Sequence, residues 1–350
     1  MISYTSGTTG TPKGVLISAA QLRALSTRPN PVRLGIDTRF LVVLPLFHMA
    51  GVGWIATIAW AGGTLVFLPS ADPLQVASAV STYAITDTML VPALIEMVMN
   101  DPRVGKDAFD GLRSLSYGAS PTPGPTRDQM MLRFTGVDLN HGYGLSETVG
   151  PVSALTPADH RAGGGILESV GRALPGIQIM VVDSETGAKL PDGQTGEIWT
   201  RSDQNCAGYF RRPQDTQALF AGDWLRTGDL GRLVDDMLFI SGRIKDMIIT
   251  GGENVYAIEV ERVLVGLSGV KEACVVGVPH PTWGQTVVAA VVADPTLSVN
   301  DVTLINGCRD NLAHYKCPAA IHLVRELPRN ATGKVLRDVV RQMFNSSDNP

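Results

Sequence analysis

The chain has 350 residues, 44% hydrophobic and 18% charged, so it is long enough to bury more than one core and we expect two domains. A net charge of −4, with no run of basic residues interleaved with aromatics, argues against nucleic acid or an anionic membrane as a partner and favours small molecules. The scattered cysteines predict neither a zinc site nor a disulfide framework and favour a reducing, cytoplasmic setting; they are Cys206, Cys274, Cys308 and Cys317.

The first motif covers residues 4–15, where small hydroxyl residues are interleaved with Gly7, Gly10 and Gly14. Such a loop can turn tightly and direct backbone N–H groups and hydroxyl oxygens to one point, where an anion is the natural guest. Lys13 adds a mobile positive charge. A solvated linker is the alternative interpretation. The β-branched run that follows instead predicts a loop held between two strands, unlike the common P-loop, which opens a helix.

Residues 40–70 contain no charged side chain and imitate a membrane span. Prolines, a histidine and a glycine pair interrupt the stretch, which predicts a strand, a buried helix and a second strand instead. The helix is apolar on all sides, so Val52 and Trp54 either line an apolar substrate channel or belong to the core. His48 precedes the helix, and out of context such a histidine is a packed, hydrogen-bonded core residue.

From residue 64 to residue 100, strand-like and helix-like segments alternate, with prolines at the helix starts. This alternation is typical of βα units on a parallel sheet. A further strand from residue 114 ends in a glycine turn formed by Gly118, Ala119 and Ser120. Nucleotides bind at such strand ends in open α/β sheets, so we expect a nucleotide there.

Two later segments carry polar groups suited to a nucleotide. In residues 141–148, Tyr143 offers a flat face for a stacked base and Glu147 a hard oxygen ligand for Mg²⁺ between phosphates. In residues 224–230, we expect the Asp229 carboxylate to be held in a turn, where it can accept hydrogen bonds from both ribose hydroxyls. The alternative for both segments is an ordinary turn, with Asp229 as its capping residue.

The remaining chain predicts two further regions. Short strands with turns between residues 169 and 201 indicate a small antiparallel or barrel-like subdomain. An amphipathic helix runs through Ile258, Val260 and Val263, and the last hundred or so residues indicate a compact α+β unit. Its expected strands are 273–278, 286–292 and 320–324, and its expected later helices are 302–312 and 335–344.

These motifs, together with residues 242–249 and 328–334, resemble the signatures of the acyl-activating, AMP-forming enzymes: acyl-CoA synthetases, firefly-luciferase-like ligases and nonribosomal adenylation domains. The resemblance covers essentially the whole chain. Ser146 stands where the family usually has threonine, which keeps the hydroxyl. The resemblance implies an α/β fold, with a βα-layered nucleotide-binding core and a small β subdomain. A hinge at Lys245 would join residues 1–244 to a mobile α+β domain of residues 245–350.

The resemblance also implies ATP, Mg²⁺ and CoA as cofactors and assigns roles to single residues. Glu147 would bind Mg²⁺, Asp229 the ribose and Arg243 the nucleotide, while Lys334 would bridge the carboxylate and the α-phosphate. Out of context, a loop lysine such as Lys334 is a solvated surface charge. His48 would act as a gate near the incoming thiol. The phosphates would lie among Thr5, Ser6, Gly7, Thr8, Thr9 and Lys13, the adenine along Gly118, Ala119, Ser120, Tyr143, Gly144 and Ser146, and pantetheine along Gly251 and Gly252.

The implied activity is the ATP-dependent conversion of a carboxylic acid to acyl-AMP and then to acyl-CoA. The uncharged wall of residues 40–70 favours a fatty or other apolar acid. Two alternatives stay open: transfer to a carrier protein, and a non-catalytic nucleotide-binding remnant. Relatives carry an N-terminal subdomain before the phosphate loop, and Met1 leads straight into residues 2–4, which also leaves no room for a signal peptide. We therefore expect a fragment, a shortened gene product or a chain completed by another, with self-association into a homo-oligomer as one outcome.

Overall fold

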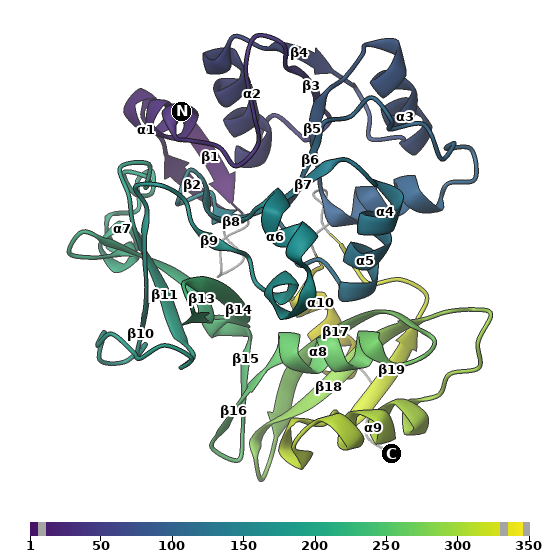
Figure 1. Ribbon diagram of the computed structural model, residues 1–350. Coiled ribbons are helices and arrows are strands. Elements are labelled where there is room, and N and C mark those ends of the chain that lie inside the picture. Colours follow the sequence, from purple (N-terminus) through teal and green to yellow (C-terminus); the bar gives the residue numbers. More distant parts are fainter. Residues whose placement is uncertain (6–11, 330–334, 346–350) are drawn as a thin grey trace. The chain divides into compact units, whose positions relative to one another are not determined.

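The computed structural model describes residues 1–5, 12–329 and 335–345. The chain divides into two compact units, Met1–Ile240 and Ser241–Pro350, shown in one ribbon in Figure 1. The family resemblance places the domain boundary between residues 244 and 245, where it expects a hinge. This boundary stays a prediction, because the division into compact units does not locate a hinge. Each unit is described by itself below.

A seven-stranded sheet forms the centre of the first unit. Four neighbouring pairs are parallel, from β4 through β3, β5 and β6 to β7, whereas β8 and β9 add antiparallel at one edge. The predicted βα alternation on a parallel sheet is therefore confirmed. The strands in spatial order are β4 (Thr64–Phe67), β3 (Arg39–Val42), β5 (Asp87–Leu90), β6 (Ser114–Gly118), β7 (Asp138–Leu145), β8 (Gly150–Leu155) and β9 (Arg172–Ala173).

Helices cover both faces of this sheet, and the alternation of side chains along β3 shows why. Leu41 packs into the main core with α3 (Pro73–Thr82), α4 (Pro92–Asn100) and α5 (Gly124–Arg133). Its neighbours Phe40 and Val42 point the other way and pack against α2 (Met49–Ala61). Figure 1 shows α2 on one side of β3 and α3 on the other. A strand buried on both faces explains the near-continuous apolar run seen in the sequence.

The chain starts with an antiparallel hairpin of β1 (Ile2–Thr5) and β2 (Lys13–Leu16). The first motif therefore lies between two strands, as predicted. Helix α1 (Ala19–Thr27) follows and opens with a capping box of Ser18 and Gln21. A second, antiparallel sheet confirms the predicted small β subdomain. It consists of β10 (Gln178–Val182), β11 (Gly196–Arg201), β13 (Trp224–Val234), β12 (Phe220–Ala221) and β14 (Met237–Arg243), with α6 (Pro157–Ala162) and α7 (Pro213–Leu219) outside the sheets.

In the residues that the structure describes, the second unit is a five-stranded sheet with three α-helices, which confirms the predicted α+β class. The prediction missed a hairpin, because residues 253–256 form a strand before the amphipathic helix begins at Ala257. The elements are β15 (Met247–Thr250), β16 (Glu253–Tyr256), α8 (Ala257–Gly266), β17 (Val270–His280), β18 (Gly284–Ala293), α9 (Asp301–Asn311), β19 (Ala320–Val324) and α10 (Arg337–Asn345). Strand β18 pairs antiparallel with β17 and parallel with β19.

The uncharged stretch of residues 40–70 folds as β3, α2 and β4, the predicted strand, helix and strand. Helix α2 has 13 residues and ends at Gly62, whose left-handed conformation stops the helix. Among the helices that the structure describes, none is both long and apolar enough to cross a membrane.

Gly171 provides a test of how closely the antiparallel edge of the sheet is packed. Its φ is +79°, and a Cβ built there would lie 1.8 Å from the carbonyl oxygen of Ala154 on β8. Because neither backbone can give way locally, we expect Gly171→Ala to lower the free energy of unfolding by about 2–4 kcal/mol in urea titrations.

Gly193→Ala is the matched control, since Gly193 has a φ of +85° but no atom within 4 Å of the added methyl. Only the backbone strain remains there, so a loss of about 1 kcal/mol is expected. Equal losses in the two variants would show that the close approach at Gly171 has no energetic weight.

Candidate nucleotide site

The hairpin at the start of the chain brings Thr5 and Lys13 face to face. The two residues are paired in the strand register, and the Thr5 hydroxyl lies 3.5 Å from the Lys13 carbonyl oxygen. The proposed phosphate ligands Ser6, Gly7, Thr8 and Thr9 lie outside the described residues. The two ends of the motif are thus fixed by a β ladder at the position expected of a strand-bound loop.

Residues 204–210 connect this hairpin to the segment that carries Glu147. Their backbone pairs with β2 through three hydrogen bonds: Leu16 N–H to the Gly208 carbonyl, Ala207 N–H to Leu16 and Phe210 N–H to Gly14. Four residues earlier, the Cys206 N–H donates to the Glu147 carbonyl at 2.8 Å. The Gln204 amide, fully buried, donates to the carbonyls of Thr148 and Pro151. We call residues 204–210 the connecting segment.

Side chains of the connecting segment and α7 link Lys13 to Glu147. The Tyr209 hydroxyl donates to Glu147 Oε1 at 2.8 Å, and its ring lies beneath the Lys13 ammonium, 5.1 Å from the ring centroid. Lys13 Nζ also pairs with Asp215 Oδ1 at 2.6 Å. Burial, reinforced by the Glu147 charge, raises the pKa of Tyr209, and the hydrogen bond from Lys13 lowers the pKa of Asp215. The Lys13 ammonium and the Glu147 carboxylate, a group that can bind a metal ion, therefore both contact the side chain of Tyr209.

Glu147 suits a magnesium ion that arrives with phosphates. Its carboxylate is half-buried just beyond the end of β7, and Oε1 is oriented by the Tyr209 hydroxyl. Within residues 1–5, 12–329 and 335–345, no cluster of three or more His, Cys, Asp or Glu could hold a metal by itself. Mg²⁺ is commonly bound through one or two carboxylates plus substrate phosphates, so a single oriented carboxylate fits this chemistry.

The predicted adenine segment lies at the end of β6, beside the parallel strand β7, which runs on to Leu145. Gly118 pairs with Gly142, and a Cβ on Gly118 would lie 2.3 Å from the Gly142 carbonyl oxygen. The next residue, Ala119, has a φ of +64°, a strained value for a residue with a side chain. Ala119 is exposed and Ser120 half-buried, so this bent backbone is open to solvent at the strand ends.

Tyr143 and Asp229 meet, although 86 positions separate them. The Tyr143 hydroxyl donates to Asp229 Oδ2 at 2.8 Å. Tyr143 and Gly144 lie on β7 itself, and Ser146 follows it, where the Ser146 carbonyl accepts from the Val149 N–H. The residues expected to contact base and ribose are therefore neighbours within the first unit.

The prediction that Asp229 sits in a turn was wrong. Asp229 lies on β13, at a bulge where three residues of β13 oppose the single residue Ile198 of β11. Gly228 supplies a φ of +68° there, and the Thr227 hydroxyl accepts from the Asp229 N–H while donating to the Ile198 carbonyl. The bulge gives the local bend that a turn would have given.

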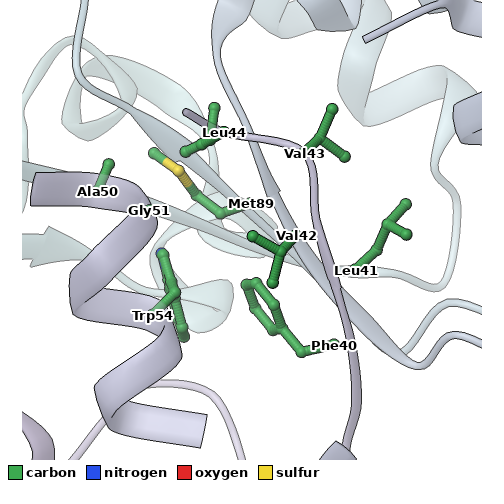
Figure 2. A pocket seen from close by; sticks show the side chains of 9 residues that line it. All are labelled: Phe40, Leu41, Val42, Val43, Leu44, Ala50, Gly51, Trp54 and Met89. Carbon is green, nitrogen blue, oxygen red and sulfur yellow. The ribbon is translucent and has the colours of Figure 1, made fainter. Parts of the chain in front are cut away.

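His48 caps the N-terminus of α2, where its Nδ1 accepts from the Ala50 N–H at 3.3 Å. Beyond it, a small apolar pocket lies between α2 and β3 (Figure 2). Figure 2 shows Trp54 beside Phe40; the two rings stack at 4.8 Å between centroids. Val52 packs instead with the cluster around Val15 and Met49. Both side chains are packed in apolar clusters, which favours the core interpretation over an open channel.

The other expected residues belong to the second unit or fall outside the description. Arg243 ends β14, Lys245 is an exposed residue of a short 3₁₀ turn, and Gly251 with Gly252 forms the turn between β15 and β16. Both glycines have positive φ, and the Gly251 N–H donates to the Trp283 carbonyl. Lys334 lies outside the described residues.

Sequence reasoning missed three groups that the fold brings to the site. Tyr209 and Asp215 lie in a segment without a recognisable motif, and only their contacts with Lys13 and Glu147 single them out. The third group is a histidine pair beside the adenine segment. His141 stacks on Tyr117 at 4.6 Å, and the Tyr117 hydroxyl lies 2.8 Å from His160 Nε2.

Family models place the chain among known proteins. Residues 1–210 match the model of the AMP-binding enzyme family, and residues 259–334 match that of the AMP-binding enzyme C-terminal domain. The chain belongs to the AMP-binding enzymes. This adenylate-forming family also accounts for the mixed α/β fold followed by a separate C-terminal domain.

Individual AMP-binding enzymes match this chain in sequence or structure along nearly its whole length. A fatty acid–acyl-carrier-protein ligase of Streptomyces coeruleorubidus is 36% identical over 97% of this chain and 66% of its own length. A long-chain-fatty-acid–CoA ligase of Mycobacterium tuberculosis is 33% identical over 99% of this chain and 68% of its own length. The crystal structure of ATP-bound MatB from Rhodopseudomonas palustris superposes with a TM-score of 0.90 at 32% sequence identity. The match covers 99% of this chain and 68% of MatB. The chain thus spans about two thirds of the length of these relatives.

The stacked His141 makes the stability of this AMP-binding enzyme depend on pH. Burial lowers the pKa of His141 to about 3, and burial also lowers the pKa of His160. An unfolded histidine binds a proton near pH 6.5, so stability is lost as pH falls below that value. We expect His141→Gln to flatten the fall of unfolding free energy between pH 6 and 4 by at most about 1.4 kcal/mol per pH unit.

Urea titrations at several pH values measure this slope. His314→Gln, which alters an exposed histidine of the second unit, is the control and should leave the slope unchanged. An unchanged slope in His141→Gln as well would mean that His141 takes up its proton in the native protein.

Proposed function

We propose that this chain activates a carboxylic acid with ATP and transfers the acyl group to CoA. In the first half-reaction, a carboxylate oxygen attacks the α-phosphorus, the bond to the β-phosphate oxygen breaks, and acyl-AMP and pyrophosphate form. In the second, the thiol of CoA gives up its proton and attacks the acyl carbon, the bond to AMP breaks, and acyl-CoA forms. Membership of the AMP-binding enzymes supports both steps.

One observation carries the proposal: a cation and a carboxylate are joined through Tyr209, in the same unit as the Tyr143–Asp229 pair. Lys13 suits the negative charge of the phosphates, and Asp229 suits the ribose hydroxyls. Glu147 would hold Mg²⁺, which would offset charge on the phosphates when bound. Together these groups match the successive parts of ATP: base, ribose and phosphates.

The second unit supplies the remaining roles in this proposal. Lys334 would hold the carboxylate against the α-phosphate during adenylation, where two anions repel each other. A rotation about Lys245 would then withdraw Lys334 and bring Gly251 and Gly252 to the pantetheine arm. Arg243 would contact the nucleotide, and His48 would stand near the thiol. Glycines suit a narrow tunnel, because the backbone can approach the thiol arm closely.

For the acid, we propose a fatty or other apolar carboxylate, supported by the absence of Asp, Glu, Lys and Arg from residues 40–70. The names of the relatives span fatty acids, indoleacetate and sulfoacetate, so the family alone does not choose among them. A carrier-protein thiol is the second candidate acceptor, favoured by the name of the Streptomyces coeruleorubidus relative.

A panel of carboxylic acids tests the proposal directly. AMP release is measured for each acid with ATP and Mg²⁺, with and without CoA, and with a phosphopantetheinylated carrier protein. Acid-dependent AMP release that CoA increases is the expected result. Binding of ATP without acid-dependent pyrophosphate exchange across the panel would instead identify a non-catalytic nucleotide-binding chain.

Lys334 gives the sharpest kinetic prediction. If its ammonium contacts both reacting anions only during adenylation, Lys334→Ala should slow acyl-AMP formation about 10²–10³-fold. Thioester formation from supplied acyl-AMP and CoA should proceed at nearly the parental rate, because the domain rotation has removed the residue. Single-turnover measurements of each half-reaction separate the two effects.

Lys271→Ala is the matched control, since it removes another lysine of the second unit whose side chain is 53% exposed. It should leave both half-reactions unchanged. Equal slowing of both half-reactions in Lys334→Ala would contradict the rotation, and no slowing of either would leave Lys334 a solvated surface charge.

A further inference from the structure

We propose that Tyr209 is a positioning residue for the phosphate site. Its hydroxyl orients the Glu147 carboxylate for Mg²⁺, and its ring holds the Lys13 ammonium through a cation–π contact. The inference rests on the proposed function, because it assigns Mg·ATP as the ligand. It adds a residue that no sequence motif singled out, and it makes the cation and the carboxylate parts of one arrangement.

The backbone of Tyr209 is fixed before any ligand arrives. It forms a bridge with Val15 on β2, two residues after Lys13, and its N–H donates to the Thr216 hydroxyl at 2.9 Å. Gly208 permits this approach to α7, since a Cβ there would lie 2.3 Å from the Thr216 methyl. The Tyr209 side chain therefore leaves from a point set by β2 on one side and α7 on the other.

The hydroxyl of Tyr209 acts on Glu147 as a hydrogen-bond donor. The distance of 2.8 Å to Oε1 is that of a good O–H···O bond, in which the phenol hydroxyl donates and the carboxylate oxygen accepts. A hydrogen bond to a charged partner in a half-buried site restricts the carboxylate to one orientation. The Tyr209 hydroxyl is therefore placed to fix the direction of Glu147 Oε1.

The ring of Tyr209 acts on Lys13 through a different contact. The ammonium lies 5.1 Å from the ring centroid, within the range of a cation–π interaction, and the Lys13 side chain is only 13% exposed. Asp215 holds the same ammonium at 2.6 Å. Asp215 thus gives Lys13 an anionic partner beside the ring, and phosphate oxygens offer the same charge and acceptor geometry.

Tyr209→Phe separates positioning from packing, because it keeps the ring against the cluster of Val15 and Leu219 and removes only the hydroxyl. Calorimetric titration of the full chain with ATP, once with excess Mg²⁺ and once with EDTA, measures the effect. We expect Mg·ATP binding to weaken about 10-fold and metal-free ATP binding to stay unchanged. Tyr83→Phe removes the hydroxyl of a tyrosine that is 45% exposed and should change neither value.

A double-mutant cycle with Glu147→Gln tests whether Tyr209 acts through the carboxylate. If it does, adding Tyr209→Phe to Glu147→Gln should not weaken Mg·ATP binding further. Independent, multiplying effects would overturn the proposal. So would an equal loss of affinity with and without Mg²⁺ in Tyr209→Phe, which indicates a purely structural role.

The parental chain separates failure of this inference from failure of the proposed function. A parent that binds Mg·ATP more tightly than metal-free ATP supports nucleotide use, and the variant then decides the role of Tyr209. A parent that binds neither form contradicts the proposed function and, with it, the ligand assumed here.

Tyr209→Leu, which also removes the ring beneath Lys13, should weaken metal-free ATP binding as well. Unchanged metal-free binding in that variant would contradict the role of the ring.

Discussion

The candidate nucleotide site depends on the backbone pairing of residues 204–210 with β2 and with the Glu147 carbonyl. These hydrogen bonds join two motifs that lie more than a hundred positions apart, and they place Tyr209 between Lys13 and Glu147. Buried amide donors from Gln204 complete the connection. Because buried backbone groups must be paired, this segment cannot move without leaving donors and acceptors unsatisfied. The separation of cation and carboxylate is consequently a property of the main chain rather than of two flexible side chains.

The parallel sheet contributes the second constraint. Strands β6 and β7 are parallel, and Gly118 at the end of β6 pairs with Gly142 of β7, so the bent backbone after Gly118 lies beside the segment of β7 that carries Tyr143. The small antiparallel sheet then contributes Asp229 from a separate part of the chain. Tyr143 and Asp229 therefore come from different sheets of one compact unit, and the hydrogen bond between them ties those sheets together at the candidate site.

Sequence reasoning found the parts of the site that have local signals. Glycine spacing and strand-like flanks located the loop at residues 4–15 between two strands, and apolar runs with proline punctuation located the βα units. It failed where the decisive contact is non-local. Nothing near Tyr209 reveals its bond to Glu147, and nothing near Asp229 distinguishes a bulge from a turn, since both use a glycine with positive φ beside a polar residue. The hairpin of β15 and β16 was missed because residues 253–256 lead directly into the helix that begins at Ala257, and the helical pattern of apolar residues was the stronger local signal.

The bulge on β13 has a consequence for how this fold tolerates insertions and deletions. Thr227 and Gly228 are two residues more than a regular ladder needs opposite Ile198. If both were deleted, the flanking pairs could close into an uninterrupted ladder, with Asp229 directly opposite Ile198. Directly opposed residues share a face of the sheet, and the Ile198 side chain is completely buried. The shorter strand would be the more regular one, yet it would place the carboxylate of Asp229, already only 4% exposed, on the apolar face of Ile198. Evolutionary loss of two residues here would thus preserve the sheet while displacing Asp229, the residue proposed to bind the ribose.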